Sequence, residues 1–213
     1  MRKVRFFNGG YYHIYNRGVE KRDIFVEKEN IERFYQSMQE FNVVEPIGSL
    51  YAASFRKAHP LRNLVSKKDE QLVDFIAFCL NPNHYHFILQ QVEDRGIGKF
   101  MHRIGVGYSN YFNKKYKRSG SLFQGTFKAV HIDSDEYLLH VSAYVNLNYK
   151  IHQIDSSLIR SSWKEYNFED KNGFCKKEII LNQFGDRNGY KEFVKTSLDV
   201  SLRRKELERL LET

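Results

Sequence analysis

The sequence predicts an α+β fold of the ferredoxin-like class: an antiparallel sheet with helices packed mainly on one face, followed by a helical C-terminal extension. Segments with strand and helix periodicity come in the order strand, helix, strand, strand, helix, strand, helix. Two of the predicted strands are separated only by Asn-Pro-Asn at positions 81–83, so they should form a hairpin. Helices interleaved with strands that pair in this way favour an antiparallel sheet.

The first strand and the first helix are predicted close to the N-terminus. HIYNRG, from His13, reads as a short strand, and residues 27–41 repeat apolar side chains at helical spacing. Residues 46–71 hold two of the three prolines and show no steady period. We therefore expect an inserted loop there.

The centre of the chain predicts the hairpin and a long helix. Residues 73–80 form a continuous apolar run that is typical of a buried strand, and residues 84–92 predict the strand that returns after the turn. Residues 96–120 repeat apolar side chains at helical spacing despite interior glycines, and the segment ends in a strongly basic stretch before Ser119 and Gly120.

A further strand and helix complete the predicted domain. Residues 121–132 predict a strand that contains Gly125, and Asp133 with Glu136 three residues later resembles a capping box at the start of a helix over residues 134–148. Beyond Trp163, which we expect to pack the extension onto the sheet, come shorter helical segments (KKEIILNQF, YKEFVKTSLDV) and a charged tail. We divide the chain into a domain over residues 1–166, with the insertion at about 46–71, and a helical extension over residues 167–213.

Composition favours a polyanionic partner and an intracellular location. Lys and Arg number 34 against 26 Asp and Glu, which gives a net charge of +8, and there are 14 Tyr and 17 Phe. Positive charge mixed with aromatic rings suits a nucleic acid whose bases can stack. The two cysteines give no disulfide framework, and no apolar run approaches the roughly 20 residues that span a bilayer. We expect a cytoplasmic protein with no membrane partner.

Two histidines interrupt the hairpin pattern. Residues two apart on a strand point to the same side, so His84 and His86 present their rings together while Tyr85 and Phe87 face the opposite, apolar side. Neutral imidazole is the commonest metal-binding side chain, so this pair is a candidate metal site. Two structural histidines that meet by chance are the alternative.

The helix over residues 134–148 offers groups that complete such a site. His140, Tyr144 and Asn148 follow one another at i+4 steps, on one face of the helix. A tyrosine hydroxyl beside a divalent cation loses its proton more readily and can attack a phosphodiester, while Asn148 supplies a neutral oxygen ligand. A tyrosine packed in the core with its hydroxyl hydrogen-bonded is the alternative for Tyr144.

These segments resemble motifs of a known family. NPNHYHFIL resembles the HUH motif of the single-tyrosine HUH transposases, AYVNLN resembles the helix motif that contains their nucleophile, and GSLFQGTFKA resembles the strand segment before that helix. Together with YHIYNRGVEKRDIF they are most similar to the REP-associated tyrosine transposases, from about residue 11 to residue 166. The chain departs from many relatives at residues 147–149, which read LNY in place of LNP and leave room for the helix to continue.

The resemblance implies an HUH endonuclease fold and a metal-dependent endonuclease and strand transferase that acts on single-stranded or hairpin DNA. By this resemblance His84 and His86 bind Mg²⁺ or Mn²⁺, Asn148 is the third ligand, and Tyr144 attacks the scissile phosphate. The implied products are a 5′-phosphotyrosine linkage and a free 3′-hydroxyl. The site of action would be the cytoplasm, at the nucleoid, and the sequence leaves open whether the protein is a monomer or a homodimer.

Two basic clusters are candidate DNA contacts. One is the arm of Arg2, Lys3 and Arg5, since basic arms can enter a DNA groove. The other lies at the end of the long predicted helix, where cations could neutralise phosphates and a ring could stack on a base. Its members are Lys114, Lys115, Tyr116, Lys117 and Arg118. Positive charge that only complements the helix dipole is the alternative for this second cluster.

Three further alternatives stay open at the level of the sequence. The chain could be a non-catalytic regulatory protein that binds DNA hairpins, or Cys79 could join His84 and His86 in a zinc site. The catalytic tyrosine could also be Tyr108, Tyr111 or Tyr116, although the first two share a face with apolar residues that favours packing. We expect structural or surface roles for the remaining candidate histidines, His102, His131 and His152.

Overall fold

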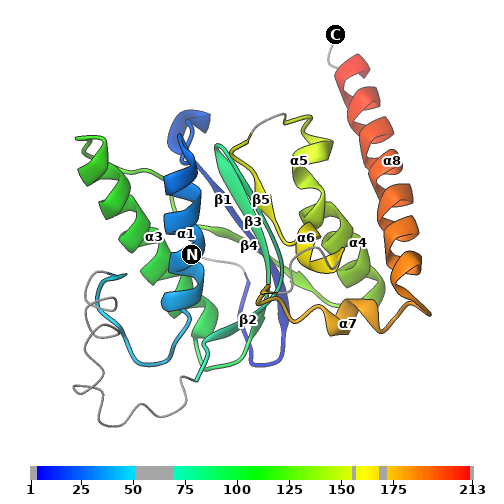
Figure 1. Ribbon diagram of the computed structural model, residues 1–213, viewed down its shortest axis with the longest axis horizontal. Helices are drawn as coiled ribbons and strands as arrows, with labels where there is room; N and C mark the ends of the chain where they lie inside the picture. The colour runs from blue at the N-terminus through cyan, green and yellow to red at the C-terminus, as the bar shows by residue number, and fades with distance from the viewer. Residues whose placement is uncertain (1–3, 51–69, 155–156, 168–171, 212–213) are drawn as a thin grey trace.

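A five-stranded antiparallel sheet forms the centre of the protein (Figure 1). The computed structural model describes residues 4–50, 70–154, 157–167 and 172–211. The strands lie in the order β4-β1-β3-β2-β5, and every neighbouring pair is antiparallel. Their bounds are Tyr11–Arg17 (β1), Val73–Asn81 (β2), His84–Gln91 (β3), Lys128–Ile132 (β4) and Arg160–Ser161 (β5). With an α-helix after β1 and another after β3, the first four strands form the predicted ferredoxin-like arrangement, which confirms the fold class.

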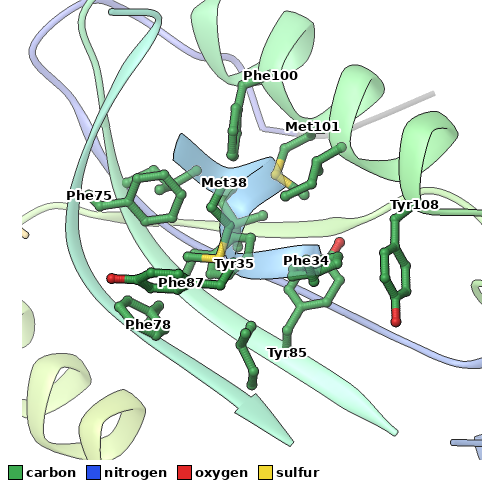
Figure 2. Close-up of a cluster of buried hydrophobic side chains, with 14 of the residues drawn as sticks. Phe34, Tyr35, Met38, Phe75, Phe78, Tyr85, Phe87, Phe100, Met101 and Tyr108 are labelled. Carbon is green, nitrogen blue, oxygen red and sulfur yellow. The ribbon is translucent and has the colours of Figure 1, made fainter. Parts of the chain in front are cut away.

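One face of the sheet is covered by α1 (Lys28–Glu40) and α3 (Gly96–Lys115). Phe34 of α1 and Phe100 of α3 are fully buried, and they belong to the same apolar core as Tyr85 and Phe87 of β3 (Figure 2). The other side chains labelled in Figure 2 are Tyr35, Met38, Phe75, Phe78, Met101 and Tyr108. Close packing in this aromatic core fixes the position of β3, and with it the side chains on the opposite face of that strand, which include His84 and His86.

Helices also cover the second face, which differs in detail from the prediction that they pack mainly on one. The helix α4 (Asp135–Asn146) lies there, and α8 (Arg187–Leu211) packs on it (Figure 1). The physical reason lies in apolar side chains that β2 and β3 present to this face, where they are buried in one cluster with residues of α4 and α8: Ile76, Ala77, Cys79 and Ile88. Short helices complete this layer: α5 (Asn148–Ile151), α6 (Trp163–Tyr166) and α7 (Glu178–Leu181).

Several element boundaries differ from the prediction. The helix α4 is capped by Ser134, whose hydroxyl accepts a hydrogen bond from the Tyr137 amide at 3.3 Å, and not by Asp133 with Glu136. The predicted strand over residues 121–132 shortens to β4, because the segment before it turns through Gly125 at a φ of 69°. The last two predicted segments merge into the single helix α8. Most of the insertion predicted at residues 46–71 lies outside the described residues.

The extension packs on the second face through aromatic side chains. The ring centroid of Trp163 lies 6.3 Å from that of Tyr190 in α8, and Tyr190 is fully buried. In the part of the chain that the structure describes, no helix combines the length and the apolar character that crossing a bilayer requires.

Candidate active site

The candidate site is built on the face of β3 that points towards α4. His86 pairs with Tyr15 and His84 with Arg17 across the β1–β3 ladder, so alternate residues of β1 share this face. The residues between them, Tyr12 and Ile14, are fully buried in the core on the opposite side. Strand β1 therefore contributes His13, Tyr15 and Arg17 to the surroundings of the histidine pair.

His84 is held at both ring nitrogens. Its Nδ1 lies 2.6 Å from Oδ1 of Asn83, and its Nε2 lies 3.0 Å from Oδ1 of Asn148 and 2.9 Å from Nδ2 of Asn81. Because a carboxamide oxygen only accepts, Nδ1 carries the proton towards Asn83. The lone pair on Nε2 then faces Asn148 and Asn81.

His86 lies deeper, among other rings. Its ring centroid is 5.2 Å from that of His84, 5.6 Å from that of Tyr15 and 5.5 Å from that of Tyr144. Burial, with smaller contributions from His13, His84 and His152, holds the pKa of His86 well below its ordinary value. The imidazole is therefore neutral, which is the form that binds metal ions.

Tyr144 reaches the histidines from α4. Its ring meets that of His86 edge to face at an interplanar angle of 88°, and its ring centroid lies 6.0 Å from that of His13. Burial raises the pKa of the phenol, while the neighbouring carboxamide of Asn148 lowers it. The structure thus brings Tyr144 and Asn148 together with both histidines, whereas the third helix residue singled out by spacing, His140, packs against Phe193 at 5.1 Å.

The side chains around Asn148 fit a bound cation. Its Oδ1 accepts from Nδ2 of Asn81 at 2.8 Å and also faces Nε2 of His84, so two acceptors converge on one point. Its own Nδ2 is buried and makes no hydrogen bond with the described residues. Nδ2 of Asn81 lies within hydrogen-bonding distance of both acceptors, 2.9 Å from Nε2 of His84 and 2.8 Å from Oδ1 of Asn148, so both lone pairs point to one place that a cation would share. His84, His86 and Asn148 therefore form a candidate set of one oxygen and two nitrogen ligands.

The zinc alternative finds less support. The thiol of Cys79 is fully buried, and burial raises its pKa to about 12, whereas a zinc ligand is a thiolate. Its Sγ lies 3.6 Å from Oδ1 of Asn81. Within the described ranges, no cluster of three or more His, Cys, Asp or Glu side chains could hold a metal, so a site here needs the carboxamide of Asn148.

A cavity of about 600 Å³ opens in front of His84, His86 and Tyr144. Three cations line it, each from a different element: Arg17 at the end of β1, Lys21 in the 3₁₀ turn η1 (Val19–Lys21), and Lys128 at the start of β4. The side chain of Arg17 is oriented by Gln124, which accepts a hydrogen bond from its Nε. None of the three was predicted as a site residue. The alternation of His13, Tyr15 and Arg17 along the first strand was the signal that could have found the first.

His152 also lines this cavity, and its ring centroid lies 5.4 Å from that of His84. Sequence spacing had suggested only a structural or surface role for His152. The break between α4 and α5, which places it beside His84, was not predicted. His131 packs against the rings of Phe7 and Tyr12, and His102 is exposed on α3, as expected for structural and surface residues.

The competing tyrosines have structural partners. The Tyr108 hydroxyl is buried and donates to the Ile24 carbonyl at 2.6 Å, and Tyr111 lies against α1, with the Arg33 guanidinium 5.2 Å from its ring centroid. Tyr116 donates to Oε1 of Glu27 at 2.6 Å. These contacts tie the tyrosines to the packing of α1 and α3.

The DNA-binding residues predicted from charge lie in varied settings. Arg2 and Lys3 fall outside the described residues, and Arg5 is exposed. Lys115 forms ion pairs with Glu27 and Glu29 at 2.7 and 2.5 Å, so it holds the end of α3 to the start of α1 together with Tyr116. The remaining cluster members also differ from one another: Lys114 and Lys117 are exposed, and Arg118 donates to Oδ1 of Asn113 at 3.0 Å. Their contact with DNA stays a prediction.

Comparison with known proteins bears on this geometry. The sequence model of the family described as "Transposase IS200 like" matches residues 54–148. This segment is similar to the IS200-like transposases. The resemblance predicted from the motifs is confirmed at the level of this family, and the IS200-like segment contains His84, His86, Tyr144 and Asn148.

Two solved structures are similar to a larger part of the chain. A REP-associated tyrosine transposase bound to a REP hairpin is 12% identical, with a TM-score of 0.49, and the match covers 88% of this chain and 92% of the other. A Deinococcus radiodurans R1 protein named as a transposase is also 12% identical, with a TM-score of 0.38, and the match covers 73% of this chain and 100% of the other. No curated protein matches the sequence significantly.

Proposed function

We propose that this protein is a metal-dependent endonuclease and strand transferase for single-stranded DNA, with Tyr144 as its nucleophile. The observation that carries the proposal is the meeting of the Tyr144 ring with the His84–His86 pair and Asn148 beside one cavity, within the segment that matches the transposase family. A phenol can act as the nucleophile of a transesterification, and two imidazoles with a carboxamide oxygen can hold the metal ion that assists it.

The reaction follows from these groups. The Tyr144 oxygen attacks the scissile phosphorus, the bond from phosphorus to the 3′-oxygen breaks, and the 3′-oxygen leaves with a proton as a free hydroxyl. The 5′-phosphate stays on Tyr144 as a phosphodiester. A 3′-hydroxyl from a second strand can then attack that phosphodiester and release the phenol, so joining needs no ATP because each bond broken is replaced by an equivalent one.

The side chains divide the task of supporting this exchange. Because burial raises the pKa of Tyr144, the resting phenol is protonated and needs help to lose its proton. Mg²⁺ or Mn²⁺ held by His84, His86 and Asn148 would supply Lewis acidity that polarises the phosphoryl oxygen and favours the phenolate. The carboxamide of Asn148 acts in the same direction, because it lowers the pKa of the phenol.

Single-stranded DNA is the substrate that suits the cavity. Arg17, Lys21 and Lys128 on its wall can neutralise consecutive phosphates, and Tyr15, whose ring lies 6.0 Å from Lys128 Nζ, offers a face for a base. Recognition of a nearby DNA hairpin is proposed from the motif resemblance. All of these side chains come from one chain, so a monomer would be sufficient for cleavage. The proposed site of action is the nucleoid in the cytoplasm.

The test uses hairpin oligonucleotides with single-stranded flanks, labelled at either end and incubated with purified protein and Mn²⁺. We expect a denaturation-resistant adduct that carries the 3′-labelled product, and a released 5′-labelled product that a polymerase can extend. Tyr144→Phe should form no adduct, while the matched variant Tyr137→Phe, altered at an exposed position of the same helix, should react like the wild type. An adduct formed by Tyr144→Phe would refute the assignment.

A hairpin-binding regulatory protein without turnover is the second candidate function. The raised pKa of Tyr144 is the observation that favours it, because a protonated phenol is a poor nucleophile. The same experiment separates the two candidates. Hairpin binding by the wild type with no adduct in Mg²⁺ or Mn²⁺ would support the regulatory protein and refute the enzyme.

A further inference from the structure

His13 is the side chain nearest to the candidate site to which no role has been given so far. It lies on β1, one diagonal step from His86 across the ladder, where side chains on one face of a sheet come within reach of one another. Its Nε2 lies 2.9 Å from Nδ1 of His86, and the two rings stack with centroids 5.1 Å apart at an interplanar angle of 21°.

The contact between the two nitrogens needs a single proton. A separation of 2.9 Å between two ring nitrogens is that of a hydrogen bond, so one proton lies between them. A neutral imidazole has one nitrogen that donates and one that accepts. Either Nδ1 of His86 or Nε2 of His13 must therefore carry the proton. This choice decides whether the other nitrogen of His86, Nε2, is protonated or keeps its lone pair.

The two choices have different consequences for a metal. If Nδ1 of His86 donates to His13, then Nε2 of His86 keeps its lone pair and can bind a cation. If instead Nε2 of His13 donates, the proton of His86 moves to its own Nε2 and blocks coordination there. His84 shows the first pattern already, with Nδ1 directed at Asn83 and Nε2 at Asn148.

We propose that His13 is a positioning residue that accepts the Nδ1 proton of His86 and so holds the Nε2 lone pair of His86 ready for the metal. This inference rests on the proposed function, in which His86 is a ligand. Partners that fix the tautomer and orientation of a metal-binding histidine are a general requirement, and they are most often carboxylates, carbonyls or water. Here the partner is a half-buried imidazole, which can accept the same proton through its own ring nitrogen.

The first readout is metal binding, measured on His13→Phe and His13→Gln. Phenylalanine keeps a ring of similar size but accepts no hydrogen bond, whereas glutamine offers an oxygen at about the reach of Nε2. Loss of such a partner typically weakens metal binding about 10–100-fold, and we expect His13→Phe to lose Mn²⁺ affinity to this extent. We expect His13→Gln to recover most of the loss. The matched control is His131→Phe, the same change at a histidine of β4 whose side chain lies on the other face of the sheet from His13. This variant should bind Mn²⁺ like the wild type.

The second readout is the tautomer of His86 itself, from ¹⁵N NMR of the metal-free, histidine-labelled protein. We expect an unprotonated Nε2 in the wild type and in His13→Gln, and a protonated Nε2 or a mixture of tautomers in His13→Phe. Binding of hairpin DNA in the presence of a chelator, together with thermal unfolding, shows whether each variant is folded.

The outcomes separate this inference from the proposed function. If the wild type binds no Mn²⁺ and forms no adduct, the proposed function fails together with the role of His86. If the wild type does both and a folded His13→Phe retains Mn²⁺ affinity and an unprotonated Nε2, only the role of His13 is refuted. Equal losses in His13→Phe and His13→Gln would assign His13 to ring packing and would also overturn the inference.

Discussion

The side-chain oxygen of Asn148 lies 3.0 Å from Nε2 of His84, although the two residues are 64 positions apart in the chain. The contact depends on a break in the helix layer. The helix α4 ends at Asn146, Leu147 adopts a φ of −113°, and Asn148 begins the separate short helix α5. Tyr144 on α4 and Asn148 on α5 thus lie beside the same pair of histidines. On a continuous helix, the two side chains would follow one another one turn apart along the helix axis.

Replacing Asn148 by alanine should weaken Mn²⁺ binding and abolish adduct formation while hairpin binding persists. The change removes the one oxygen among the proposed ligands, together with the carboxamide that lowers the pKa of the Tyr144 phenol. Asn148→Asp should retain or increase Mn²⁺ affinity, because hard divalent cations prefer carboxylate oxygen. Calorimetric titration with Mn²⁺ and the adduct assay check both variants. Unchanged affinity in Asn148→Ala would remove it from the ligand set.

The cations of the cavity should contribute to the salt dependence of DNA binding. Arg17→Gln and Lys128→Gln should each reduce the slope of log K against log salt by roughly 0.7, the value for one phosphate of a single strand. Binding isotherms on a labelled single strand at several salt concentrations give the slope. The matched pair is Lys114→Gln and Lys117→Gln at the end of α3, where the sequence predicted contact. A larger slope change in this second pair would place the DNA on the α3 side.

Lys115 and Tyr116 should affect stability more than DNA binding. Their partners Glu27 and Asn30 lie at the start of α1, so the two residues connect α1 to α3 over the aromatic core. We expect Tyr116→Phe to lower the midpoint of thermal unfolding and to leave DNA affinity unchanged. An unchanged midpoint with weakened DNA binding would instead support base stacking by this ring.

The parts of the structure that could be predicted from the sequence are those governed by local periodicity. The hairpin around Pro82, the pairing of His84 with His86 on one face, and the order of the elements follow from alternation and turn chemistry. The apolar run of β2 also contained the reason for a second covered face, but such a run does not say which helices will cover it.

The features of the site that the sequence did not predict depend on contacts between distant segments of the chain. The place of His13 beside His86 follows from strand register, which no local pattern fixes. The ion pairs of Lys115 follow from the packing of α3 on α1, so a basic stretch that looks available for DNA can be partly neutralised by another helix. The position of His152 beside His84 depends on the break at Leu147.

The tyrosine helix is held in place by Tyr190 of α8, which should make the site sensitive to a change far from the cavity. Ser142 donates its only hydroxyl proton to the Leu139 carbonyl at 2.7 Å, so the Tyr190 hydroxyl donates to Ser142 at 3.0 Å. Nδ2 of Asn146 donates to the Tyr190 oxygen at 2.9 Å. The hydroxyl thus links α8 to α4 at two points, one on either side of the turn that carries Tyr144.

Tyr190→Phe should lower the free energy of unfolding by about 1–3 kcal/mol, because the buried amide of Asn146 loses its acceptor. It should also slow adduct formation through a less well oriented Tyr144, with little change in Mn²⁺ affinity. Urea unfolding, the adduct assay and Mn²⁺ titration give the three readouts, and Tyr137→Phe, altered at an exposed phenol, is the control.

The same variant should change the response to alkali. Burial raises the pKa of Tyr190 above its ordinary value of 10.0, so the folded state disfavours the phenolate. Below about pH 10 the phenol is neutral in both states and its contribution to stability is complete; above that pH the unfolded chain ionises first, and stability falls. The wild type should therefore lose stability between about pH 9 and pH 11, and Tyr190→Phe should lose less over that interval, because one of the buried phenols responsible is gone. Urea unfolding at pH 9 and at pH 11 measures the loss of unfolding free energy in wild type and variant. An equal loss in both would mean that Tyr190 ionises as easily in the folded chain as in the unfolded one.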